Sequence, residues 1–131
     1  MKRQPTTSMK LRNLFLLSAV SSSLLFSGLS YADDATDISR LLRTGQTAEA
    51  LQRVEAGLAS KPKDAQLRFL KGLILTEQNK NGDAIAVFTK LTDDYPELPE
   101  PYNNLAVLYA AAGQYDKARA ALEMAIRTNP T

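Results

Sequence analysis

The feature that most constrains the fold of this chain is a spacing of 34 residues that recurs over most of its length. Pro62, Pro96 and Pro130 stand 34 residues apart, and each of them ends a segment of similar pattern. The segments are GQTAEALQRVEAGLASKP, NKNGDAIAVFTKLTDDYP and GQYDKARAALEMAIRTNP, which share few identical residues. A fixed period of this size is typical of stacked supersecondary units, none of which can bury its apolar face alone. The sequence therefore predicts an array of stacked units.

When the units are aligned at this offset, residues of one kind fall into the same columns. One column holds the small residues Ala50, Ala84 and Ala118. A second holds the large apolar residues Val54, Phe88 and Leu122, and a third holds the turn residues Gly45, Asn79 and Gly113. Upstream, Gly72 aligns with Ala106 and Leu75 with Tyr109. Small residues let two antiparallel helices approach closely, and the large ones fill the space that remains. The turn column needs a left-handed backbone, which Gly adopts without steric cost and Asn tolerates.

Each unit reads as two antiparallel helices, with helical segments over 64–78, 82–94 and 98–113. Apolar residues in these segments recur at steps of three and four, which is the period of a helical stripe. Asp64 is a suitable N-cap. Pro99 and Pro101 suit a first helical turn, because the N–H groups that they lack would have no intrahelical partner there. The prediction is an all-α solenoid of helix pairs, each closed by a proline.

The first 32 residues have the pattern of a secretory signal peptide. They hold four basic residues and no acid, and the apolar run LFLLSAVSSSLLF is followed by the small-residue site SYA at 30–32. We expect cleavage after about Ala32, export to the bacterial periplasm, and a mature repeat domain over 33–131. A permanent membrane anchor is the weaker alternative, because the run of 13 residues is shorter than the ~20 that span a bilayer. Met9 is an alternative start to Met1.

Composition excludes several classes of function. The net charge of +2 becomes −2 when the four basic residues of the leader are removed, so the mature part shows no basic face for nucleic acid. The chain has no Cys and no His, which excludes thiolate and imidazole metal ligands and the nucleophile pairs that depend on them. The spacing of the carboxylates isolates no buried pair for acid–base catalysis. We therefore predict no cofactor, no metal and no enzymatic activity.

The columns resemble the tetratricopeptide repeat, whose pattern combines a large aromatic, Leu-Gly or Leu-Ala, Tyr, Gly, Ala, a large apolar residue, Ala and Pro. The last unit matches it at Tyr102, Leu105, Ala106, Tyr109, Gly113, Ala118, Leu122, Ala125 and Pro130. The middle unit matches at Gly72, Ala84, Phe88 and Pro96. It departs at two positions, where Arg68 replaces the aromatic and Lys71 replaces the Leu. The resemblance predicts three units of about 33–64, 65–98 and 99–131, the first of them degenerate, with no helix before Asp33.

The resemblance also implies a right-handed superhelix whose first helices line a concave groove that binds a peptide or a protein. The implied groove residues are Gln66, Phe69, Leu73, Thr76, Glu77, Glu100, Asn103, Asn104, Val107, Ala110 and Ala111, with Ser39, Leu42 and Arg43 extending the row from the first unit. For Phe69 the alternatives are an anchor for an apolar ligand side chain and a contact with the neighbouring helix. The amides of Asn103 and Asn104 either bind a peptide backbone or are merely solvated. A clamp for a C-terminal carboxylate is disfavoured, because Phe69 and Leu73 stand where such a site needs polar groups.

Three functional hypotheses follow. The first is a non-catalytic scaffold or adaptor of the periplasm that holds a protein client. The second is a part of a larger envelope protein or enzyme whose activity lies beyond residue 131. The third is a module that associates with itself through the apolar stripe of its last helix, because the preceding helix can bury only part of that stripe.

Overall fold

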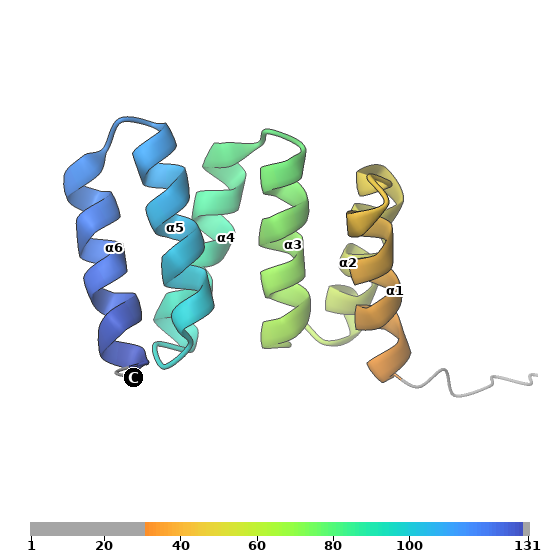
Figure 1. Cartoon of the computed structure of the whole chain (residues 1–131). Helices are drawn as coiled ribbons and strands as arrows, with labels where there is room; N and C mark the ends of the chain where they lie inside the picture. Colours follow the sequence, from red (N-terminus) through yellow and green to blue (C-terminus); the bar gives the residue numbers. More distant parts are fainter. Residues whose placement is uncertain (1–30, 130–131) are drawn as a thin grey trace, which may run out of the picture.

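The computed structural model describes residues 31–129, which form six α-helices and no strand. The helices are α1 (Tyr31–Arg43), α2 (Thr47–Ser60), α3 (Ala65–Glu77), α4 (Asn81–Asp94), α5 (Pro99–Ala111) and α6 (Tyr115–Thr128). They pair along the chain, and the pairs stand in a row (Figure 1). This confirms the predicted all-α repeat array. Helix α1 begins at Tyr31, two residues before the earliest predicted start at Asp33. The predicted leader, apart from its last two residues, lies outside the described residues.

The turns within the pairs have the backbone that the turn column predicted. Gly45 and Gly113 have φ angles of 75° and 73°, and Asn79 has φ 59°. In each turn the residue after the left-handed one donates its N–H back to a carbonyl of the preceding helix, as Gln46 does to Leu41 O at 2.9 Å. The three turns therefore reverse the chain in the same way, and the helix pairs are equivalent units.

The helix ends also follow local chemistry. The side chain of Asp64 accepts a hydrogen bond from the Leu67 N–H at 2.9 Å, which caps α3 as predicted. Pro99 is the first residue of α5, and Pro101 lies in the same turn. Pro96 follows the C-cap residue of α4, where it lies outside the helix. Pro130 lies outside the described residues, so the proline that closes the last unit stays a prediction.

The column of small residues lies at one position in every pair. Ala50, Ala84 and Ala118 are each the fourth residue of their helix, and all three are buried. Gly72 of α3 faces the ring of Phe88 of α4, and a Cβ atom on Gly72 would lie 2.5 Å from the ring atoms Cε1 and Cζ. Real side chains do not tolerate such a contact. The predicted close approach of the two helices therefore depends on Gly72.

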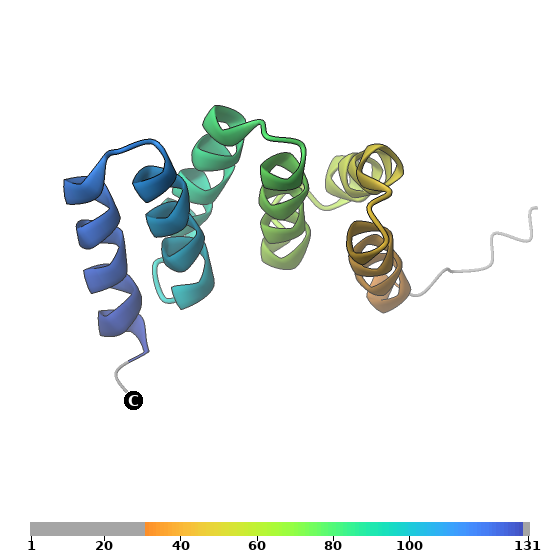
Figure 2. The same cartoon turned by 45° about the horizontal axis from the view of Figure 1, so that its top comes forward.

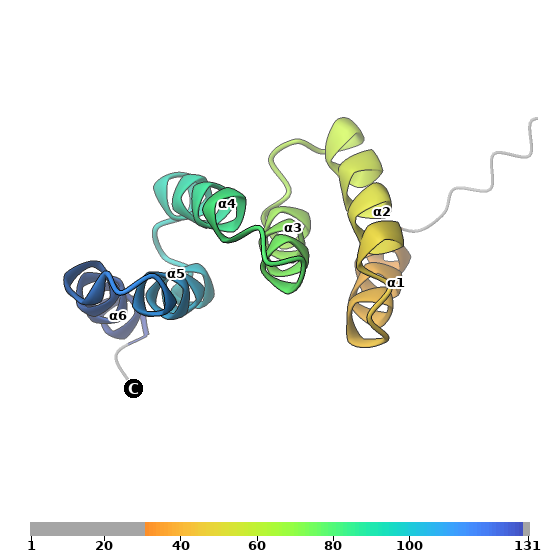
Figure 3. The same ribbon diagram turned by 90° about the horizontal axis from the view of Figure 1, so that it is seen from above.

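The buried side chains form a core that runs along the array. One cluster joins α1, α2 and α3 and includes Ile38 and Val54, and another joins α3 to α6 and includes Phe88 and Leu105. Leu51 and Leu73 pack against both clusters. Figures 2 and 3 show that the pairs follow a bent path, with α1, α3 and α5 on the inner side of the bend and α2 and α4 on the outer side. This arrangement leaves an inner and an outer face for binding.

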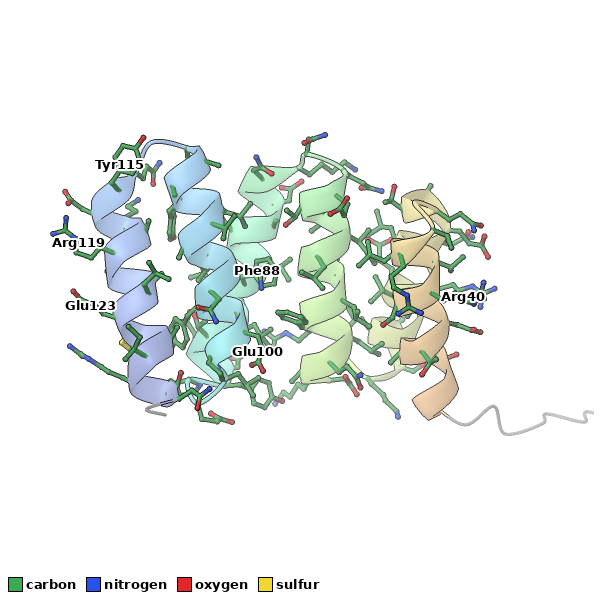
Figure 4. The ribbon with its side chains drawn as sticks, in the orientation of Figure 1. Arg40, Phe88, Glu100, Tyr115, Arg119 and Glu123 are labelled. Atoms are coloured by element: carbon green, nitrogen blue, oxygen red, sulfur yellow. The ribbon has the colours of Figure 1, made fainter. Side chains whose placement is uncertain are left out.

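The last helix exposes part of its apolar stripe, as predicted. Ala118, Ala121 and Ala125 are buried, whereas Leu122 is 48% and Ile126 67% exposed. Val107 of α5 is exposed as well. Figure 4 shows that Arg119 and Glu123 point away from the other helices on the far side of α6. The end of the array therefore combines a charged outer surface with exposed apolar side chains.

Candidate functional site

The inner face holds a hollow between the first turns of α3 and α5. Its volume is about 340 Å³. The lining residues are Ala65, Gln66, Phe69, Leu98, Glu100 and Pro101. Both helix starts are fixed by local sequence, since Asp64 caps α3 and the two prolines begin α5. We call this the inner hollow.

Phe69 contributes both to the inner hollow and to the core. Its ring is tilted by 57° against the ring of Phe88, with the ring centroids 5.7 Å apart. It is only partly buried, and it also lines the hollow. The structure therefore shows the contact with the neighbouring helix, and the role of Phe69 as an anchor for a ligand stays a prediction. The contact with Phe88 holds the ring in one place, which reduces the entropy that a ligand would otherwise lose on binding there.

The polar groups around the inner hollow are few. The carboxylate of Asp64 already accepts a bond from the Leu67 N–H. Pro99 and Pro101 have no N–H to offer at the start of α5. The side chains of Gln66 and Glu100 are exposed at the rim. An apolar floor with a small number of polar groups at its edge is the usual composition of a site that seats one apolar side chain and orients what is attached to it.

Several predicted groove residues have intramolecular roles. The Asn104 amide donates from Nδ2 to Glu100 O at 2.9 Å, and the Thr76 hydroxyl donates to Gly72 O at 2.9 Å. Both bonds lie within their own helix. Leu73 packs against both core clusters. These three side chains therefore have partners within the array.

Three further predicted groove residues, Glu77, Asn103 and Val107, are exposed and do not line the inner hollow. Glu77 lies at the end of α3, and Val107 is 68% exposed on α5. Asn103 lines a separate hollow of about 300 Å³ between α5 and α6, together with Pro99, Glu100, Ala125, Ile126 and Asn129. Of the predicted groove residues, Gln66, Phe69 and Glu100 line the inner hollow.

Sequence reasoning missed three walls of the inner hollow: Ala65, Leu98 and Pro101. Leu98 carried a signal, because it is an apolar residue in a linker between two acids, Glu97 and Glu100. Pro101 was predicted to start a helix but not to line a site. Its face toward α3 depends on how two repeats stack, which no single segment of the sequence determines.

The described residues 31–129 contain neither a metal-binding cluster nor a membrane-spanning helix. Among them, no group of three or more acidic side chains is placed to hold a metal ion. No helix in that range is long and apolar enough to cross a membrane. At Asp94, hydrogen bonds from Lys90 and Arg68 lower the pKa of the carboxyl group. That group lies on the outer face.

The sequence matches two family models, both described as tetratricopeptide repeat, over residues 38–99 and 75–131. No curated protein matches the sequence. Among solved structures, a chain in the one described as "Structure of Naa15/Naa10 bound to HypK-THB" is similar, with a TM-score of 0.64 and 23% sequence identity. The match covers 76% of this chain and 15% of that chain. This likeness supports the fold.

Proposed function

Because residues 38–131 match tetratricopeptide repeats, which generally mediate contacts between proteins, we propose that the chain is a non-catalytic scaffold that binds a client on its inner face. The observation that carries this proposal is the inner hollow, with Phe69 held in its floor. The client is a peptide or an exposed segment of a protein. It places an apolar side chain against Phe69, Leu98 and Pro101.

The rim of the inner hollow supports recognition of the client's backbone. Gln66 carries an amide that donates and accepts at once, so it can pair with a peptide group. Glu100 adds a carboxylate that favours a client with a basic or N–H donor group next to its apolar side chain. The contact would be small and specific, as expected of a scaffold that binds and releases its clients.

We place this activity in the bacterial periplasm. The proposal rests on the leader pattern of residues 1–32, which combines basic residues, an apolar run and a small-residue site. Without Cys, the repeat domain uses no disulfide, and its stability in an oxidising compartment depends on packing alone.

Affinity capture from periplasmic extract tests the inner-face proposal. The variants are Phe69→Ala, which removes the floor, and Gln66→Arg, which fills the hollow without removing a core side chain. The matched control is Gln52→Arg, which makes the same change at an exposed position of α2. We expect the control to retain the clients and both inner-face variants to lose them. Retention of every client by Phe69→Ala and Gln66→Arg would show that the proposal is wrong.

A second candidate function is self-association through the end of the array. Leu122 and Ile126 correspond by the 34-residue period to Phe88 and Thr92, which are both buried, and Phe88 packs in one cluster with Leu105 of the next repeat. In this candidate a second copy covers the exposed pair. Sedimentation over a concentration series tests it, with Ile126→Glu as the variant that keeps the chain monomeric. A chain that is monomeric at every concentration would exclude this function.

A further inference from the structure

We propose a second binding site, on the outer face at the junction of the first two repeats, that takes an acidic segment of a partner protein. Lys63, Arg68, Lys71 and Lys90 line it, and we call it the cationic cleft. It is separate from the inner hollow and does not depend on the proposed function of that hollow.

The cationic cleft consists of two adjoining hollows of about 600 and 240 Å³. Pro62, Arg68 and Lys90 line both of them, so the two are continuous. The walls come from the end of α2 and the linker after it, from α3 and from α4. Figure 3 shows α2 and α4 on the outer side of the bend, on either side of α3.

The cleft exists because the middle repeat departs from the repeat pattern. Arg68 and Lys71 stand where the last repeat has Tyr102 and Leu105. Those two side chains are buried, and the Tyr102 hydroxyl donates to Pro96 O at 3.3 Å. The same junction is thus filled by apolar groups in the last repeat and lined by cations in the middle one. A change of this kind opens a surface without altering the helix pairs.

Arg68 is held in position before any ligand arrives. Its Nη1 lies 2.8 Å from Asp94 Oδ2, and its guanidinium carbon lies 6.0 Å from the centroid of the Tyr95 ring. The Tyr95 hydroxyl in turn donates to Lys63 O at 2.6 Å. The side chain of Arg68 is only 11% exposed, yet it lines both hollows. A guanidinium has five N–H donors, so donors remain for a ligand carboxylate at little further entropic cost.

The charges in the cleft do not balance. Asp94 Oδ2 lies 2.8 Å from Arg68 Nη1, and Asp94 Oδ1 lies 2.8 Å from Lys90 Nζ, so one carboxylate forms ion pairs with two cations. Lys71 Nζ is 3.5 Å from Glu55. The Lys63 side chain makes no ion pair with any residue in the described part. Four cations against two acids leave an excess of two positive charges, which favours a ligand with carboxylates.

The form of the ligand follows from the extent of the cleft. The positive charge is confined to the junction of the first two repeats. The exposed acids Asp93 and Glu97 lie close in sequence to Asp94 and Tyr95 of the cleft, so the basic surface does not extend past them. A nucleic acid needs a longer basic stripe. The cleft also has apolar walls at Leu58 and Val87. A short segment that alternates acidic and apolar side chains fits both features, with its carboxylates toward Arg68 and the lysines.

Fluorescence anisotropy with the full chain tests the cationic cleft. The probe is a short fluorescein-labelled peptide in which Glu and Leu alternate, and the control peptide has Gln in place of Glu. We expect Arg68→Gln to weaken binding about tenfold, because the loss of one hydrogen bond to a charged group lowers an affinity by about that amount. Lys63→Gln, which breaks no ion pair among the described residues, should weaken it about threefold. The control variant Lys80→Gln removes an exposed charge at the other end of α4 and should change nothing.

Two results would overturn the proposal. One is unchanged affinity in both Lys63→Gln and Arg68→Gln. The other is equal binding of the Gln peptide, or of duplex DNA, at the same salt concentration. Gln66→Arg separates the two sites, because it blocks the inner hollow and leaves the cationic cleft intact. Loss of client capture without loss of the Glu peptide would leave this proposal standing.

Discussion

The middle and the last helix pairs have helices of equal length and the same kind of turn, but they carry different side chains. In the middle pair Gly72 faces Phe88, and by the 34-residue period the last pair has Ala106 and Leu122 in those places. A smaller residue on one helix thus goes with a larger one on the other. Spacing between helices depends on the sum of the two volumes, so the array can keep its geometry while the individual residues change.

The same two pairs differ more strongly on the outer face. There the last repeat buries Tyr102 and Leu105, whereas the middle repeat has Arg68 and Lys71 with their ion pairs. The positions of Gly72 and Phe88 must keep a nearly constant total side-chain volume, because both lie in the interior. The positions of Arg68 and Lys71 can change from apolar to charged. This difference shows that the junction between helix pairs can carry either apolar or charged side chains.

The largest expected difference between the two pairs is at Phe88 and Leu122. Phe88→Ala removes a ring with 0% exposure and should lower the free energy of unfolding by about 3–5 kcal/mol. Leu122→Ala removes a half-exposed side chain and should lower it by about 1 kcal/mol or less. Urea denaturation followed by circular dichroism at low protein concentration measures both. Equal losses would contradict the exposure of Leu122 at the end of the array.

The next largest effect is expected at the contact between Gly72 and Phe88, where a larger residue on one helix requires a smaller one on the other. Gly72→Ala should destabilise the chain by about 1–3 kcal/mol because the new methyl group meets the Phe88 ring. This outweighs the gain of about 1 kcal/mol that Ala normally gives in a helix. Adding Phe88→Leu, which installs the pair of the last repeat, should restore part of the loss in a double-mutant cycle.

The matched control is Gly82→Ala in α4, where nothing lies within 4 Å of the new Cβ atom. It should be neutral or stabilising by up to about 1 kcal/mol. If Gly72→Ala and Phe88→Leu change the free energy of unfolding additively, the residue sizes at the two positions do not compensate for each other.

A smaller effect is expected when the junction of the last repeat is installed in the middle one. The double variant Arg68→Tyr with Lys71→Leu should keep the free energy of unfolding within about 1 kcal/mol of the parent, because apolar residues often replace ion pairs at little cost. It should also lose the Glu-containing peptide. Thermal denaturation and anisotropy on one preparation measure the two properties. A strong loss of stability would mean that the ion pairs hold the junction together.

The smallest effect is on the titration of Asp94. Hydrogen bonds from Lys90 and Arg68 lower its pKa in the folded chain, so its contribution to stability is present above the pKa of the unfolded state. That contribution is lost as the pH falls through the lowered pKa. NMR titration of the carboxyl carbon should show Lys90→Gln raising this pKa toward its ordinary value. Lys80→Gln should leave it unchanged.

The sequence predicted the parts of the fold that local chemistry controls. Gly45, Asn79 and Gly113 adopt the left-handed backbone that the turn column required, and Asp64 caps α3. These features depend on residues within a few positions of one another. The buried Ala column was also predictable, because the period places its members on equivalent helices.

The sequence did not predict which groups would meet across helices or across repeats. Arg68 and Asp94 belong to the two helices of the middle pair, and the bond from Tyr95 to Lys63 joins two repeats over 32 residues. The departures at Arg68 and Lys71 were visible, but their partners depend on the way α2, α3 and α4 stack. The same holds for the inner hollow, whose walls come from the starts of α3 and α5.

The central claim is that the inner face around Phe69 holds a client, and site-specific photo-crosslinking in living cells tests it most directly. A photoreactive amino acid replaces Gln66 at the rim of the inner hollow, and a second preparation carries it at Gln52 on the outer layer. The prediction is a discrete adduct of the chain with another protein from position 66, which disappears in Phe69→Ala. No adduct from position 66, or one that persists unchanged in Phe69→Ala, would contradict the claim.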